Sequence, residues 1–92
     1  MNQPEHRRCI MPEIYTLADA AWIQEQLLML PPTLRQKAAI GYAEVYQAAF
    51  DAEPVSYRQE NRARFAANTR LRLFVRKHYR ALQGYTEQPQ LA

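Results

Sequence analysis

Hydrophobic side chains recur at helical spacing over residues 16–30, which predicts the first helix. One apolar stripe consists of residues three and four apart, Ala20, Ile23, Leu27 and Leu30. Side chains at these spacings lie on one face of an α-helix. Thr16 followed three residues later by Asp19 resembles a capping box in which Asp replaces Glu, so we expect Thr16 to cap this helix. Apolar residues also cover its other sides, which is typical of a helix packed between others or against a partner.

The pattern predicts a second helix over residues 33–52, after a break at two prolines. Pro31 does not fit inside a helix, and Pro32 restricts the residue before it. The apolar face of the second helix consists of Leu34, Ala38, Tyr42, Val45, Ala49 and Phe50. Gly41 lies near the polar flank, where a glycine costs about 1 kcal/mol of stability relative to alanine. The pattern itself supplies no reason for this glycine.

The longest helical pattern runs from residue 56 to residue 83. Ser56 and Gln59 have the spacing of a capping box, and Gly84 is a natural residue for the C-terminal end of a helix. About 27 residues at 1.5 Å each make a helix of about 40 Å. Its apolar side consists of Ala63, Ala67, Leu71, Phe74, Val75, His78, Ala81 and Leu82. Arginines and a lysine occupy the opposite side, so this helix is strongly amphipathic.

These segments predict an all-α fold with three main helices in a single domain at residues 13–84. We interpret residues 1–12 as a flexible N-terminal arm and residues 85–92 as a C-terminal tail. The second and third helices are expected to form a long hairpin, with the first helix packed across it. A third helix that was short or broken near Asn68 would refute this arrangement. The predicted core consists of Trp22, Ile23, Leu27, Leu34, Tyr42, Val45, Phe50, Leu71, Phe74, Val75 and Leu82.

Composition supports a folded helical domain and argues against several other classes of protein. Of the 92 residues, 48% are hydrophobic and only two are glycine, which argues against a β-protein with many tight turns. The single cysteine, Cys9, cannot form an internal disulfide, which fits a reducing cytoplasm. No apolar run approaches the roughly 20 residues of a membrane-spanning helix, so no membrane partner is expected.

Positive charge is concentrated in the third helix. Residues 1–55 carry four basic and seven acidic side chains, whereas residues 56–83 carry eight basic side chains and one acidic. The net charge of +3 at pH 7 therefore comes from one segment of a chain that is otherwise acidic. Such a concentrated positive field is an argument about binding partners rather than about fold.

The basic side of the third helix is the candidate site for binding nucleic acid or a protein partner. Its candidate residues are Arg58, Arg62, Phe65, Arg70, Arg72, Leu73, Arg76, Lys77 and Arg80. Arginine forms bidentate contacts with phosphate, so DNA or RNA is one expected partner. Phe65 and Leu73 lie among the charges, and a host protein with an acidic groove and apolar pockets also fits them. A second copy of this chain, whose N-terminal half is acidic, gives a homo-oligomer as a further candidate, and a face exposed only to solvent is the remaining alternative.

Residues with catalytic or metal-binding chemistry do not form a site in the sequence. His6 and Cys9 are three residues apart, but no further ligand joins them, so no metal is expected. His78 lies on the apolar side of the third helix and is interpreted as a residue at the edge of the core. Ser56 is the only serine, and the carboxylates form no signature pair for acid–base chemistry. We therefore predict a non-enzymatic protein without a cofactor.

Parts of the chain resemble small uncharacterised proteins of lambdoid phages and enterobacterial prophages. The resemblance runs from Leu30 to Val75 and depends on three stretches, LPP, YAEVYQAAFDAEP and RQENRARFAANTRLR. It implies the cytoplasm of a bacterial host and an accessory phage function, and it carries over no catalytic motif and no functional residues. Small phage accessory proteins often bind host machinery or nucleic acid, which fits both expected kinds of partner.

Overall fold

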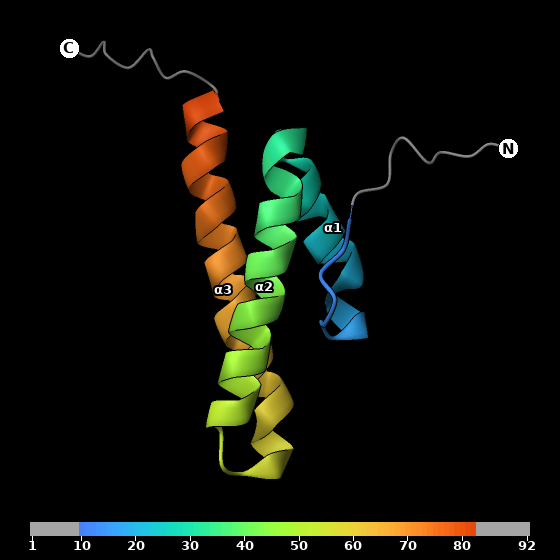
Figure 1. The fold of residues 1–92 in the computed structure, drawn as a ribbon, viewed down its shortest axis with the longest axis vertical. Helices are drawn as coiled ribbons and strands as arrows, with labels where there is room; N and C mark the ends of the chain where they lie inside the picture. Colours follow the sequence, from blue (N-terminus) through green and yellow to red (C-terminus); the bar gives the residue numbers. More distant parts are fainter. Residues whose placement is uncertain (1–9, 83–92) are drawn as a thin grey trace, which may run out of the picture.

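The computed structural model describes residues 10–82, with the side chains of residues 10–79. Within this range a short 3-10 helix, η2 (Leu17–Asp19), is followed by three α-helices, α1 (Ala20–Leu28), α2 (Pro32–Ala52) and α3 (Ser56–Leu82). α2 and α3 pack side by side as a long antiparallel hairpin, and α1 contacts both of them (Figure 1). Because α3 is continuous through Asn68, the predicted all-α hairpin fold is confirmed.

Arg35 stabilises the link between α1 and α2. Pro32 takes the first position of α2, where the N–H that proline lacks is not needed. The Arg35 guanidinium donates hydrogen bonds to three backbone carbonyl oxygens at or just beyond the end of α1, those of Leu27 (3.1 Å), Leu28 (3.3 Å) and Leu30 (3.0 Å). Carbonyl groups at the end of a helix lack partners within it, and positive charge is favourable there. The two prolines therefore end one helix and begin the next, and Arg35 joins them.

The start of α1 differs from the prediction. The α-helix begins at Ala20 rather than at Thr16, and η2 precedes it. The Thr16 side chain does not cap the helix, because its hydroxyl is hydrogen-bonded to the Tyr46 hydroxyl of α2 at 2.8 Å. Asp19 also has no capping bond and instead binds side chains of α3. The two polar residues that the sequence assigned to local capping serve contacts between helices.

Glu53 organises the turn between α2 and α3. Its side chain is buried, and its Oε2 accepts a hydrogen bond from the Val55 backbone N–H at 3.0 Å. The predicted capping box of Ser56 and Gln59 is wrong, because Ser56 is already the first residue of α3. Gln59 instead donates a hydrogen bond to the Phe50 carbonyl oxygen at 3.0 Å. The turn is thus held by side chains that reach across it rather than by a local cap.

The core lies where the three α-helices meet. Its buried hydrophobic residues are Ile23, Leu27, Leu30, Ala38, Ala39, Tyr42, Tyr46, Ala63, Ala67, Leu71 and Val75. Five predicted core residues are among them, and Trp22, Leu34, Val45, Phe50 and Phe74 pack half-buried against this cluster. The Leu82 side chain lies outside the described ones. Alanines form a large part of this core, because small side chains let two helices approach closely.

The segment before η2 packs against the helices. Pro12 is buried, and Met11 contacts the core cluster. The packed part of the chain therefore begins before residue 13, where the domain was expected to start. Residues 1–9 of the predicted arm, the predicted tail at residues 85–92 and the predicted cap at Gly84 lie outside the described residues.

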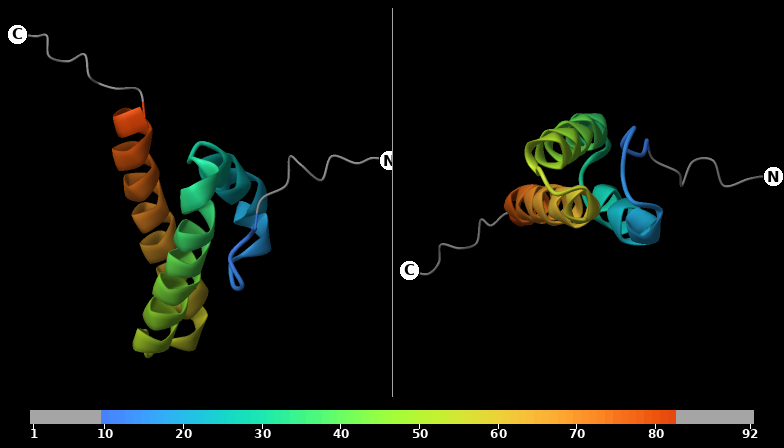
Figure 2. Two further views of the ribbon diagram at one scale, coloured as in Figure 1. Left: turned by 45° about the horizontal axis from the view of Figure 1, so that its top comes forward. Right: turned by 90° about the horizontal axis from the view of Figure 1, so that it is seen from below.

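Among the described elements, those outside the α2–α3 hairpin lie against one of its sides. Seen along its length, α1 and the segment before it lie against the same side of α2 and α3 (Figure 2). None of the described elements lies against the opposite side. No described element therefore covers the outer face of α3 or the side of the hairpin opposite α1.

Candidate nucleic-acid interface

The candidate interface is the outer face of α3, the side of the helix that is turned away from the core. The buried ridge of α3 consists of Ala63, Ala67, Leu71 and Val75, four residues apart. Among the predicted site residues, Arg58, Arg62, Phe65, Arg70, Arg72, Leu73, Arg76 and Lys77 are all exposed. The side chain of Arg80, the ninth, lies outside those that the structure describes. The ridge and the exposed residues show that α3 is amphipathic in the way the sequence predicts.

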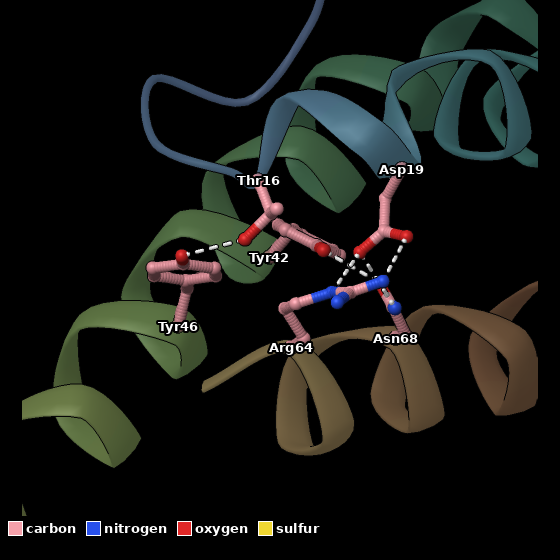
Figure 3. Close-up of polar contacts among 6 residues, drawn as sticks. All are labelled: Thr16, Asp19, Tyr42, Tyr46, Arg64 and Asn68. Carbon is pink, nitrogen blue, oxygen red and sulfur yellow. Dashed lines mark hydrogen bonds and ion pairs between the residues drawn. The ribbon is translucent and has the colours of Figure 1, made fainter. Parts of the chain in front are cut away.

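Arg64, at the margin of the basic face, is bound to the rest of the fold. Its Nε and Nη2 atoms donate to the two carboxylate oxygens of Asp19, each at 2.8 Å (Figure 3). Such a bidentate pair is stronger and more directional than a single contact. The hydrogen bond from Arg64 lowers the pKa of the Asp19 carboxyl below its usual value, and the same bond raises the pKa of the Arg64 guanidinium. Arg64 therefore joins α3 to the start of α1.

Two more side chains extend this pair into a polar network. Asn68, one turn further along α3, donates its Nδ2 to Asp19 at 3.2 Å. The Tyr42 hydroxyl of α2 donates to the Asn68 Oδ1, so the network links all three α-helices (Figure 3). Burial raises the pKa of the Tyr42 hydroxyl above its usual value, so the hydroxyl stays protonated to still higher pH than an exposed tyrosine. These partners account for the polar residues on the α1 side of α3.

Arg62 is also partly neutralised by the fold. Its Nη2 lies 3.2 Å from Oε1 of Glu53, the buried carboxylate of the α2–α3 turn. The Arg62 side chain nevertheless stays 60% exposed, so its guanidinium still reaches solvent. This contact was not expected, because the sequence shows no acidic residue on α3 placed to pair with Arg62.

Arg72 contacts an aromatic ring of α1. Its guanidinium carbon lies 5.6 Å from the centre of the Trp22 ring, within the range of a cation–π interaction. The sequence predicts Trp22 for the core and Arg72 for the binding face. The structure places them together at the edge where α1 meets α3. Arg72 therefore has a packing role as well as a charge.

The remaining basic side chains of the face have no such anchor in the other helices. Arg58, Arg70, Arg76 and Lys77 are exposed, and within the described part of the chain no carboxylate forms an ion pair with any of them. These cations and Arg72 spread over most of the length of α3. They are the part of the positive field that a negatively charged partner can reach.

Large apolar side chains lie uncovered among these charges. Phe65 is 73% exposed and Leu73 is 51% exposed. Tyr57 is 79% exposed, and it lines a shallow depression of about 420 Å³ together with Phe65, Arg58, Asn61 and Arg62. Two exposed aromatic rings therefore lie beside two arginines near the start of α3.

Tyr57 is a site residue that the sequence reasoning missed. Its position on the wheel of α3 coincides with that of Val75, which is buried, so helical spacing alone places it toward the interior. α1 does not extend along the part of the hairpin next to the α2–α3 turn, however (Figure 1). The predicted first helix, residues 16–30, is much shorter than the third, residues 56–83, so it cannot cover the third helix along its whole length. This difference in length could have indicated that Tyr57, at the start of the third helix, is exposed.

The described residues contain neither a candidate metal cluster nor a helix that could span a membrane. Residues 10–82 contain no cluster of three histidine, cysteine, aspartate or glutamate side chains that could hold a metal ion. His78 packs against Phe74, with ring centres 4.3 Å apart, as expected at the edge of the core. No described helix is both long and apolar enough to span a membrane.

No protein-family model matches this chain, and neither does any curated protein or solved structure.

Proposed function

We propose that this protein is a non-enzymatic accessory protein of a phage or prophage that binds nucleic acid through the outer face of α3 in the cytoplasm of its bacterial host. The phage context comes from the resemblance of Leu30 to Val75 to small phage proteins. The binding role comes from the chemistry of the face itself.

The observation that carries the proposal is the mixture of exposed cations and uncovered aromatic rings. Arg58, Arg76 and Lys77 are exposed without a carboxylate partner among the described residues. Guanidinium and ammonium groups of this kind bind phosphate and release counterions. A surface shaped only for solubility usually intersperses both signs of charge, which this face does not.

The aromatic residues point to single-stranded rather than double-stranded nucleic acid. Bases of a single strand can stack on exposed aromatic side chains, which contributes about 1–3 kcal/mol per base. Tyr57 and Phe65 offer such rings near Arg58, which can hold a neighbouring phosphate. In a duplex the bases are already stacked on each other, so these rings would gain little.

The second candidate is a protein-interaction module that uses the same helix to bind a host protein. Phe65 and Leu73 are exposed apolar side chains eight residues apart on the basic face, which suits an acidic groove with two apolar pockets. Such a partner would require both side chains and would not depend on phosphate.

The experiment that tests the proposal is a titration of labelled single-stranded DNA, duplex DNA and RNA with the protein, followed by fluorescence anisotropy. Two salt concentrations, about 50 and about 200 mM, separate electrostatic binding from other contacts, because phosphate binding weakens steeply as salt rises. We expect binding at low salt that is tightest for a single strand. Absence of binding to all three nucleic acids at low salt would sink the proposal and favour the protein partner.

A further inference from the structure

The two sides of the α2–α3 hairpin are filled differently. α1 lies against one side of the hairpin (Figure 2). Residues of α2 and α3 line an open hollow of about 230 Å³, to which no residue of α1 contributes. Lys37, Ile40, Gly41 and Glu44 line it from α2, and Arg70, Leu71 and Phe74 line it from α3. The groove therefore combines an apolar floor with one positive and one negative side chain on the same helix.

Gly41 leaves a vacant place on the α2 wall of this groove. A Cβ atom added at Gly41 would meet nothing within 4 Å, so packing inside this chain gives no reason for a glycine. A glycine in the interior of a helix costs about 1 kcal/mol relative to alanine. Its neighbour Ile40 is 52% exposed, so a protruding apolar side chain lies next to an empty place.

The α2 wall is complementary to itself under a two-fold rotation. Lys37 and Glu44 lie equally far, in opposite directions, from the midpoint between residues 40 and 41. If two copies of α2 cross antiparallel about an axis through that midpoint, Lys37 faces the partner's Glu44 at two equivalent places. The same operation places Ile40 beside the partner's Ile40 and Gly41 beside the partner's Gly41, because residues 40 and 41 lie on opposite sides of the contact line.

We propose that this protein forms a two-fold symmetric homodimer through the open groove, with α2 packed against α2 of a second copy. Isologous contacts of this type require a surface that matches itself, and the opposite charges of Lys37 and Glu44 beside the apolar contact of Ile40 meet that requirement. Neither Lys37 nor Glu44 forms an ion pair within the described residues, so both charges are available to the partner. This inference places self-association mainly on α2, although Arg70 of the basic face of α3 also lines the groove.

Reversing the charge of Lys37 or Glu44 tests the dimer, and a mixture of the two variants serves as the control. Lys37→Glu would place two pairs of glutamates against each other in a homodimer, and Glu44→Lys would do the same with lysines. Each single variant is expected to dimerise at least about 100-fold more weakly than the natural chain. An equimolar mixture of the two variants should dimerise again, because every opposed pair in that heterodimer joins a lysine to a glutamate.

The measurement is sedimentation velocity combined with light scattering, up to about 100 μM protein. Lys37→Glu combined with Glu44→Lys in one chain should restore the dimer, which separates loss of the interface from loss of the fold. Circular dichroism of each single variant provides a further check on its helices. The proposal is overturned if the natural chain is monomeric throughout this range, if either single variant dimerises like the natural chain, or if the mixture stays monomeric. Each result leaves the nucleic-acid titration unaffected, so the two proposals fail separately.

Discussion

The arginines of α3 divide into two groups according to what lies opposite them. Arg64 and Arg62 face the carboxylates of Asp19 and Glu53, which come from other parts of the chain. Arg58 and Arg76 face solvent and have no carboxylate partner among the described residues. The first group holds the helices together, whereas the second gives the protein an exposed positive surface.

This difference shows why a charge count along the sequence overstates a binding surface. Eight basic residues lie between residues 56 and 83, but two of them are paired with acidic side chains that are distant in sequence. The paired arginines, Arg62 and Arg64, lie between exposed arginines on the same helix and cannot be told apart from them by their spacing alone. Substitutions in the two groups should therefore act on different properties, the paired group on folding and the exposed group on binding.

The largest effect is expected at Asp19. Asp19→Ala removes the hydrogen bonds from Arg64 and Asn68 and leaves the Asn68 amide short of a partner, so we expect the free energy of unfolding to fall by about 2 kcal/mol. Urea denaturation followed by circular dichroism measures this change. Asp51→Ala is the matched control, because Asp51 is exposed and accepts a bond only from Gln47 of the same helix. It should change stability by less than about 0.5 kcal/mol. Equal effects of the two substitutions would mean that the Asp19 network does not join the helices.

Substitutions of the exposed arginines should weaken the binding of nucleic acid and leave the stability of the fold unchanged. We expect the double variant Arg58→Ala, Arg76→Ala to bind single-stranded DNA about tenfold more weakly at low salt and to lower the salt slope by about 1.4, with unchanged stability. Arg72 is not the residue of choice here, because its contact with Trp22 mixes binding with packing. Arg58→Lys with Arg76→Lys is the control, since it keeps both charges and should preserve the salt slope. Weaker binding without any change in slope would argue against phosphate contacts by these residues.

Substitutions at Gly41 and Ala63 compare the stability effect of a methyl group beside the open groove with its effect in the packed core. In the Lys37→Glu background, where the chain is expected to be monomeric, Gly41→Ala should raise the free energy of unfolding by about 1 kcal/mol, because the new methyl group meets nothing and alanine favours the helix. Ala63→Gly on the buried ridge of α3 is the contrasting change and should be destabilising. Chemical denaturation of both variants provides the comparison. A loss of stability in the Gly41→Ala variant would mean that the space beside α2 is filled.

The smallest effect is a pH dependence that comes from Asp19. Its pKa in the folded protein is lower than in the unfolded chain, where an aspartate titrates near 3.9. The stabilisation is therefore fully present above that value and is lost as the pH falls through the lower folded value, because the unfolded chain binds the proton first. Comparing denaturation of the natural chain with Asp19→Asn from pH 6 downward measures this contribution. The natural chain should lose more stability than the variant over the acidic range, and parallel curves would assign the acid sensitivity to other groups.

The sequence predicts the helices better than the contacts between them. α2 and α3 were predictable because Pro32 marks a helix start and because apolar residues repeat at helical spacing over many turns. Thr16 and Asp19 were misjudged, since their spacing suits a cap while their true partners lie thirty and forty-five residues away. Such pairings depend on how the helices pack, and local spacing carries no information about that.

In the candidate site, too, the sequence predicts the faces of a helix better than the contacts between helices. The exposure of Phe65 and Leu73 follows from the helical wheel, and the structure bears this out. The contacts of Arg62 with Glu53 and of Arg72 with Trp22 depend on where the turn and α1 end, so no pattern within α3 could reveal them. The open groove was equally hidden, because Gly41 has meaning only once its surroundings are known to be empty.

The most direct test of the two-group account is a nuclear magnetic resonance titration of the isotope-labelled protein with a single-stranded DNA oligonucleotide at low salt. We predict progressive shifts of the backbone amide signals of Arg58, Phe65 and Arg76, while those of Asp19 and Arg64 keep their positions. This result would place the ligand on the exposed group and leave the paired group to the fold. Unchanged spectra, or shifts confined to α1 and α2, would contradict the assignment of the outer face of α3 as the nucleic-acid interface.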